Sequence, residues 1–203
     1  ESLNAYSVRY LSKMYRVSTF KDYIERLYRE QTDGIHKLWG LKASWQQLAM
    51  LLRCGVIPNL LRPTILFVRR RDVIAQTISL HIANKTQEWK RTSASAGDTM
   101  PRGKLKYDAQ EILEVFRGLM HSYNLLEQIF SVAGLPIVRC DYETVLARPL
   151  DEIPALTERL LGRAHLPIES AVNIQIQRDE INEQFKARFT KDLRSLRWIA
   201  ESV

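Results

Sequence analysis

The sequence is poor in cysteine and has no long apolar run. Among its 203 residues only Cys54 and Cys140 are cysteines, and they lie far apart with no CxxC pattern. This usage is typical of a protein from a reducing compartment whose thiols are buried or incidental. Because no stretch of about 18 apolar residues occurs, a transmembrane helix is not expected. These absences favour a cytoplasmic protein, although Glu1 is not a natural start, and we expect that some sequence precedes it.

Several catalytic motifs are also missing. The chain contains no GxxxxGK[ST], GxGxxG, HExxH or GxSxG segment, so nucleotide hydrolysis, dinucleotide cofactors, zinc proteolysis and hydrolase chemistry lack their usual sequence support. The histidines are isolated, and none has metal-ligand spacing with another; they are His36, His81, His121 and His165. No metal site is predicted.

Positive charge is present in excess. The formal net charge is +7 and the isoelectric point is near 9.5, which suggests an acidic partner: nucleic acid, a membrane surface, or a phosphorylated or sulfated small molecule. A merely basic surface explains the charge equally well. The length suits one domain over residues 1–203.

Strand and helix patterns alternate along the chain. Apolar, β-branched runs predict strands over 64–68 and 135–140, and a further strand over 36–42 that bends at Gly40. Helical spacing predicts helices over 3–16, 20–31, 45–53, 72–85, 107–133, a short segment that Pro149 stops, 153–161 and 180–194. Alternation with short links predicts an α/β fold with a parallel β-sheet flanked by helices.

The most informative stretch is Pro63–Trp89. A buried strand runs directly into three arginines, and Asp72 is the predicted N-cap of the next helix. This junction should place fixed charge and free backbone N–H groups at the carboxyl edge of the sheet, where α/β proteins bind anions. The side of the helix that carries Ile74, Ile78 and Ile82 should face the core. A second side is small and polar, with Gln76, Ser79 and Ala83.

Two further features lie outside this stretch. Lys42 sits between a predicted strand and a predicted helix, where it is either a ligand-binding cation or a solvated lysine. Residues 90–104 are polar and basic without apolar periodicity, which predicts a surface loop that serves as a plain connection or as a substrate lid.

The stretch also carries a longer pattern, R-x-D-x3-Q-x2-S-x3-A-x2-T-x2-W. Its positions are Arg70, Asp72, Gln76, Ser79, Ala83, Thr86 and Trp89. With this pattern the chain resembles the trehalose 2-sulfotransferase-like family of bacterial carbohydrate sulfotransferases. The likeness extends to Gly40, Lys42 and Trp45, to Asp141-Tyr142, and to the segment 177–189, so it covers most of the chain.

The resemblance implies a function and a site. Such enzymes transfer a sulfuryl group from 3′-phosphoadenosine-5′-phosphosulfate to a hydroxyl of a carbohydrate or glycolipid, without a metal. It implies that Arg70 and Ser79 hold the 3′-phosphate, with Arg71 as a rival for the arginine role. Arg178, in the C-terminal part of the likeness, is a further candidate for donor binding. Lys42 is a candidate for electrostatic work at the leaving phosphate.

The resemblance also implies a P-loop-NTPase-like fold that here lacks its first strand and loop. The family's Pro-Arg-Ser-Gly-Ser-Thr-like loop for the 5′-phosphosulfate does not occur in the chain and should lie upstream of Glu1. Glu1 itself falls near the glutamate that serves as the base on the acceptor. The visible chain alone is therefore expected to be an incomplete enzyme.

The resemblance also bears on partners, and two alternative functions stay open beside it. A sugar or glycolipid acceptor is expected and nucleic acid is not, while peripheral membrane proximity and a homodimer stay open. The competing hypotheses are a non-enzymatic basic module, which binds nucleic acid or an anionic surface, and an inactive relative of the sulfotransferases.

Overall fold

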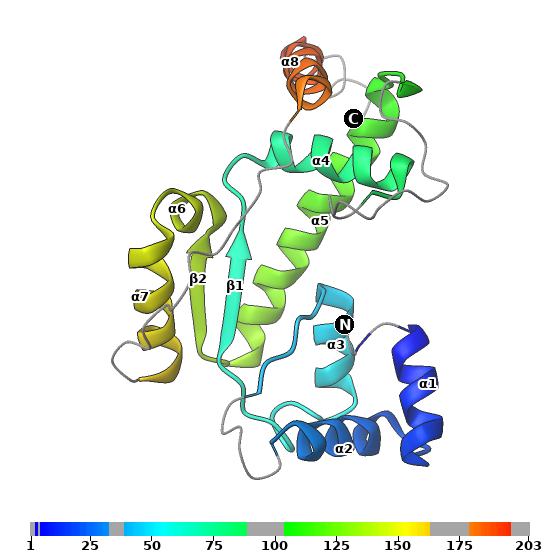
Figure 1. Cartoon of the computed structure of the whole chain (residues 1–203), viewed down its shortest axis with the longest axis vertical. Helices are drawn as coiled ribbons and strands as arrows, with labels where there is room; N and C mark the ends of the chain where they lie inside the picture. Colours follow the sequence, from blue (N-terminus) through cyan, green and yellow to red (C-terminus); the bar gives the residue numbers. More distant parts are fainter. Residues whose placement is uncertain (1–2, 4, 33–38, 89–103, 163–178, 196–203) are drawn as a thin grey trace. The chain divides into compact units, whose positions relative to one another are not determined.

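The computed structural model describes residues 3, 5–32, 39–88, 104–162 and 179–195 (Figure 1). Its backbone divides into two compact units, which are described separately. Unit 1 comprises residues 1–65 and 125–137, and unit 2 comprises residues 66–124 and 138–203. The single-domain organisation expected from the length stays a prediction.

The described residues of unit 1 form α1 (Ala5–Tyr15), α2 (Phe20–Thr32), α3 (Trp45–Arg53) and the last part of α5. The backbone N–H of Asp22 donates to Oγ1 of Thr19, which caps the start of α2. Ser44 and Gln47 form a reciprocal capping box, which sets the start of α3 at the predicted residue.

The strand expected over 36–42 is wrong in its described part. Residues 39–42 are irregular, and residues 33–38 lie outside the described chain. A strand needs a hydrogen-bonded neighbour, and the strands of the described sheet pair with each other instead. Trp39 packs edge-on against Tyr28, with ring centroids 5.7 Å apart, so an aromatic contact holds this segment.

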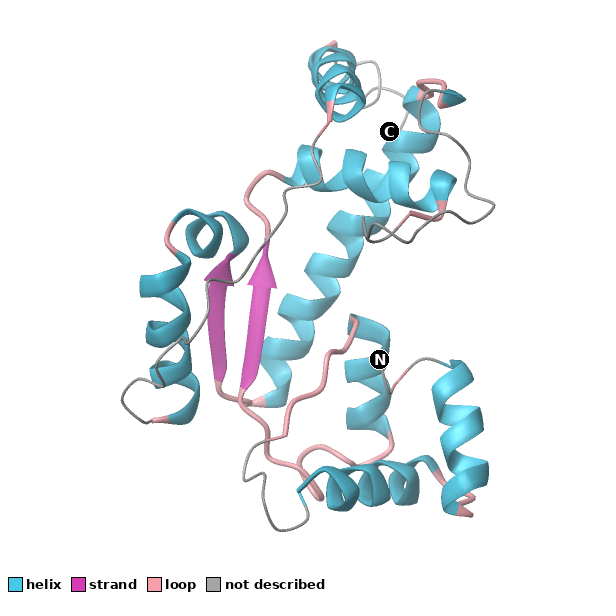
Figure 2. Cartoon of the chain, viewed as in Figure 1, coloured by secondary structure: helices cyan, strands magenta, loops and turns pink. Residues whose placement is uncertain are grey.

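Unit 2 contains the sheet. In the described residues it has two strands, β1 (Ile65–Arg69) and β2 (Ile137–Asp141), which run in the same direction (Figure 2). Phe67 of β1 is buried and contacts Tyr123 of α5 (Ala109–Ala133). The protein is thus a mostly helical α/β protein with a small parallel sheet, as predicted at this level. The P-loop-NTPase-like arrangement stays a prediction.

Two helices follow β2, namely α6 (Tyr142–Ala147) and α7 (Pro149–Leu161). As predicted, one helix ends just before Pro149, since α6 stops at Ala147. The next helix was predicted to begin at Ile153, but Pro149 is the first residue of α7. Proline is tolerated there because the first N–H groups of a helix have no intrahelical acceptor. Leu156 of α7 packs against Val138 and Cys140 of β2.

A hydrophobic core in the described part of unit 2 joins α4 (Val73–Thr86), the first half of α5, and α8 (Glu180–Arg194). Its buried members are Ile78, Ile82, Ile112, Leu113, Phe185 and Phe189, and Ile74 packs against them. The predicted apolar face of α4 is therefore confirmed. Asp179 caps α8 at the predicted boundary, because its Oδ1 accepts the N–H of Asn182. Helices α4 and α8 thus lie side by side (Figure 1).

Candidate anion site at the start of α4

Two of the three consecutive arginines are engaged by carboxylates at the end of β2. Nε of Arg69 donates to Oδ1 of Asp141 at 2.7 Å. Nε of Arg71 lies 3.8 Å from Oδ2 of Asp141 and 3.9 Å from Oε2 of Glu143. The side chain of Asp141 precedes α6 but makes no capping hydrogen bond to that helix. It pairs with the arginines of the neighbouring strand instead.

Arg70 is placed differently from its neighbours. Among the residues that the structure describes, its guanidinium has no carboxylate partner. The group lies over the ring of Tyr142, with Cζ 4.3 Å from the ring centroid. A guanidinium that lies flat on an aromatic ring keeps its in-plane N–H donors available to a ligand. This contrast favours Arg70 over Arg71 as an anion-binding residue.

The expectation of free backbone N–H groups at this junction is wrong. The N–H of Arg71 donates to Oε2 of Glu143 at 3.1 Å, and that of Asp72 donates to Oε1 at 3.3 Å. The N–H of Arg70 contacts the hydroxyl of Tyr123 at 3.4 Å. Glu143 follows β2 in sequence, so its approach depends on strand pairing and has no local signal. These three N–H groups are therefore not available to an anion.

The amide contacts also set the ionisation of Glu143. Burial alone would raise the pKa of this carboxyl group, but the N–H groups of Arg71, of Glu143 itself and of Asp72, together with the Arg71 charge, outweigh burial. The net result is a pKa below its usual value. Glu143 is therefore a charged, built-in acceptor at neutral pH.

Asp72 links the start of α4 to α8. Its Oδ1 accepts the N–H of Ala75 at 2.9 Å, which confirms the predicted N-cap. Its Oδ2 accepts from Nζ of Lys186 at 2.6 Å. Both side chains are about one-third exposed, so the pair is partly screened by water.

Ser79 lies two turns into α4 and is half-buried. Many serine and threonine hydroxyls in this fold donate to the carbonyl four residues earlier; they include Thr32, Thr77, Thr86, Ser122, Ser131, Thr157 and Thr190. Within the described chain Ser79 makes no such bond, and its Oγ instead accepts from Nδ2 of Asn182 at 3.4 Å. The hydroxyl proton of Ser79 is thereby left for another acceptor.

Asn182 and Lys186 are site residues that sequence reasoning missed as donor-binding candidates. They lie four residues apart on α8 and line a shallow hollow together with Ala75, Ile78, Ser79 and Glu183. Their spacing places them on one face of the helix. No motif marks them, because the hydrogen bond between Asn182 and Ser79 spans 103 residues of sequence.

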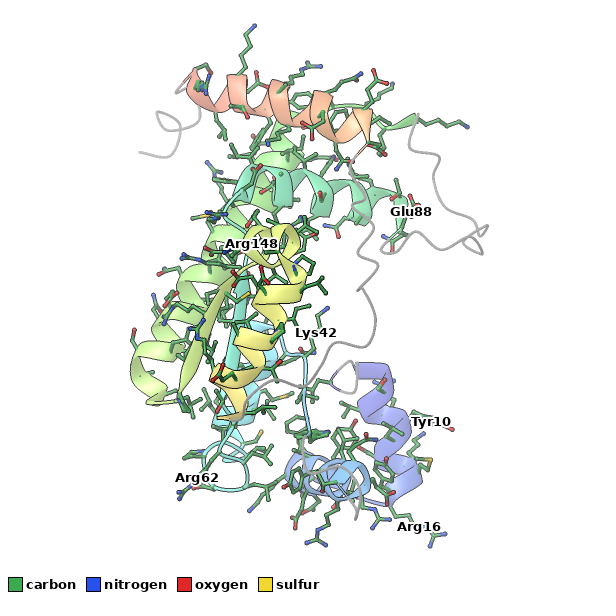
Figure 3. All side chains as sticks on the ribbon, turned by 60° about the vertical axis from the view of Figure 1, so that its left-hand side comes forward. Tyr10, Arg16, Lys42, Arg62, Glu88 and Arg148 are labelled. Carbon is green, nitrogen blue, oxygen red and sulfur yellow. The ribbon has the colours of Figure 1, made fainter. Side chains whose placement is uncertain are left out.

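The remaining predicted site residues belong to unit 1 or lie outside the described residues. Lys42 belongs to unit 1, where it is exposed on the irregular stretch before α3 (Figure 3). Glu1 and Arg178 lie outside the described residues, as does most of the predicted loop 90–104.

A family profile described as Stf0 sulphotransferase matches residues 7–192. The chain belongs to this family. The resemblance inferred from the R-x-D-x3-Q-x2-S pattern is therefore confirmed. Comparison with curated proteins and with solved structures gave no match.

The Stf0 profile includes both halves of the candidate site, from the arginines before α4 to Lys186 on α8. In the described ranges, no group of three or more metal-ligating side chains occurs. No helix in those ranges is both long enough and apolar enough to cross a membrane.

Proposed function

We propose that this Stf0 chain is part of a sulfotransferase that uses 3′-phosphoadenosine-5′-phosphosulfate as donor and a hydroxyl of a carbohydrate or glycolipid as acceptor. The observation that carries the proposal is the state of Arg70. Its neighbours in the sequence are paired with Asp141 and Glu143, whereas its own guanidinium is stacked on Tyr142 without a carboxylate partner in the described chain.

Arg70 and Ser79 suit the 3′-phosphate of the donor. A guanidinium is permanently charged and presents parallel N–H donors that match two phosphate oxygens. The hydroxyl of Ser79 supplies a neutral donor whose proton is not bound to its own helix. The N–H groups of Arg71 and Asp72, just before α4, are held by Glu143, so in this proposal the two side chains carry the phosphate.

Sulfuryl transfer leaves the 3′-phosphate, which Arg70 and Ser79 hold in this proposal, unchanged. The acceptor oxygen attacks sulfur, a new S–O bond forms, and the bond from sulfur to the 5′-phosphate oxygen breaks with its electron pair going to that phosphate. The acceptor proton passes to a carboxylate base, for which Glu1 is the candidate, and Lys42 is the candidate for stabilising the leaving phosphate. The product adenosine 3′,5′-bisphosphate keeps its 3′-phosphate, so it binds to the same residues as the donor does.

Calorimetry of the full-length protein with adenosine 3′,5′-bisphosphate tests the proposal. Arg70→Ala should weaken binding about 10- to 100-fold and Ser79→Ala about 3- to 10-fold, as expected for charged and neutral hydrogen bonds. Arg71→Ala is the matched control and should change affinity less than threefold. Adenosine 5′-monophosphate, which lacks the 3′-phosphate, should bind all of these variants equally.

Unchanged affinity in both Arg70→Ala and Ser79→Ala overturns the assignment. The basic charge of the chain supports the competing module, which predicts tight DNA binding that weakens steeply with salt and no preference for the bisphosphate nucleotide. Nucleotide binding without sulfuryl transfer to any hydroxyl acceptor would identify an inactive relative.

A further inference from the structure

The contact between α4 and α8 holds an unusual buried amide. Asn182 is 6% exposed, its Nδ2 donates to Ser79, and its Oδ1 has no hydrogen-bond partner in the described structure. A buried polar atom without a partner lowers the stability of a fold. Apolar residues surround this position on α8, since Phe185 and Ile181 belong to the adjacent core.

We propose that Asn182 is a positioning residue for Ser79 and that Lys186 is an additional cation for the phosphate that Ser79 binds. This inference rests on the proposed function and names a second element of the same site. It assigns to α8 a part in recognising the 3′-phosphate, beyond the strand–helix unit that carries Arg70.

The role of Asn182 follows from the hydrogen-bonding capacity of a hydroxyl. Serine on a helix ordinarily donates its proton to the carbonyl four residues earlier, as Ser122 and Ser131 do here. When Nδ2 of Asn182 donates to Oγ of Ser79, it occupies one lone pair of the hydroxyl and helps to hold that oxygen on the side of α4 that faces α8. The phosphate then meets a donor that is already oriented, which lowers the entropic cost of binding.

The role of Lys186 follows from its position. It lines the same hollow as Ser79 and Asn182, and Asp72 holds its ammonium group at 2.6 Å. Asp72 is fixed by its capping bond to α4, so the cation is kept beside the serine in the absence of a ligand. An ammonium carries three donors, which allows it to keep Asp72 and bind a phosphate oxygen together.

The test separates positioning from a structural role. Asn182→Leu removes the hydrogen bond and also the unpaired oxygen, so the free energy of unfolding should stay equal or rise. The affinity for adenosine 3′,5′-bisphosphate should nevertheless fall about 5- to 10-fold, while that for adenosine 5′-monophosphate stays unchanged. Gln184→Leu, an exposed amide on the same helix, is the matched control and should alter neither affinity.

A double-mutant cycle adds a second readout. In the Ser79→Ala background, Asn182→Leu should cost no further affinity, because the amide acts through that hydroxyl. Lys186→Gln should weaken bisphosphate binding about threefold or more and reduce its salt dependence, whereas the exposed Lys191→Gln should leave both unchanged.

The outcomes distinguish a failure of the proposed function from a failure of the role assigned to α8. If the unmodified protein does not bind the bisphosphate, the proposed function fails, and this inference fails with it. If binding is sensitive to Arg70→Ala but unaffected by both Asn182→Leu and Lys186→Gln, only the role of α8 is overturned. Equal losses for the bisphosphate and the monophosphate, or a loss of stability that parallels the loss of affinity, would assign Asn182 a structural role and also overturn it.

Discussion

The carboxylate of Asp72 lies 2.6 Å from the ammonium group of Lys186 and joins the first turn of α4 to α8. The same carboxylate caps α4 through its other oxygen. The cap and the ion pair can be separated by mutation, because asparagine is as good an N-cap as aspartate but carries no charge.

We therefore expect Asp72→Asn to cost less than about 1 kcal/mol in the free energy of unfolding, since a partly exposed ion pair contributes little. Asp72→Ala removes the cap as well and should cost about 0.5–2 kcal/mol more. Urea unfolding of both variants measures the difference. Equal losses would mean that the ion pair, not the cap, stabilises this junction.

The stacking of Arg70 on Tyr142 predicts an effect on nucleotide binding. Tyr142→Leu removes the aromatic face that supports the guanidinium. We expect the affinity for adenosine 3′,5′-bisphosphate to fall about two- to fivefold, which corresponds to the ~0.5–1 kcal/mol of a cation–π contact at a partly exposed site. Tyr142→Phe keeps the ring and should bind as the unmodified protein does. A loss of the same size in Tyr142→Phe would point to the hydroxyl instead.

The contacts of Glu143 with two backbone N–H groups predict that the stability of a Glu143 variant depends on added anions. Glu143→Ala leaves the N–H groups of Arg71 and Asp72 without their acceptor and should lower the free energy of unfolding by about 1–3 kcal/mol. Sulfate should then stabilise the variant more than the unmodified protein, because the vacated amides accept an anion. Sodium chloride at equal ionic strength is the control. Equal sulfate increments in both proteins would contradict this account.

Acid should weaken the same contact. The pKa of Glu143 is lowered in the folded state, so its contribution is complete above the pKa of the unfolded chain, near 4.5. It is lost as the pH falls through the folded pKa. In Glu143→Gln this part of the acid dependence should be absent, which pH titration of the unfolding midpoint measures.

His81 predicts a second pH dependence, at higher pH. The side chain is 2% exposed, and burial lowers its pKa below 6.5 in the folded state. The unfolded chain therefore binds a proton first, and stability should fall as the pH drops below about 6.5. The slope contributed by one group is at most about 1.4 kcal/mol per pH unit. In His81→Leu this slope of unfolding free energy against pH should vanish, and an unchanged slope would contradict the prediction. At pH 8 the titration of His81 contributes nothing to stability.

The two thiols should react at different rates. Cys54 is exposed after α3, whereas Cys140 is buried in β2, and burial raises the pKa of its thiol. A disulfide reagent should modify Cys54 rapidly and Cys140 only when the chain opens. Cys54→Ser should leave a slow thiol that becomes fast in urea. Rapid modification of Cys140 in the native protein would show that β2 is more accessible than its burial indicates.

The local parts of this fold could be predicted from the sequence. The cap at Asp72, the apolar spacing of Ile78 and Ile82, and the bounds of α3 and α8 depend on neighbours within a few residues. The strand expected near Trp39 failed because a strand depends on a partner, and an apolar run does not reveal whether one is available.

The site was predictable only in part, for the same reason. The pattern singled out Arg70 and Ser79, and residue type alone could not separate Arg70 from Arg71. Arg70 and Arg71 differ in their carboxylate partners, and these carboxylates lie at the end of β2 or just after it, more than 70 residues later. Likewise, the partner of Ser79 is Asn182, which no motif connects to α4.

Because α8 touches α4 through residues that are about a hundred positions apart, the two helices meet only after nearly the whole described chain has left the ribosome. Long-range contacts of this kind form late in folding, because the long chain between them has to close first. Under the proposed roles of Asn182 and Lys186, the strand–helix unit could be fully folded during synthesis and still bind nucleotide weakly. Undocking of this one helix would then release nucleotide while the sheet stays intact.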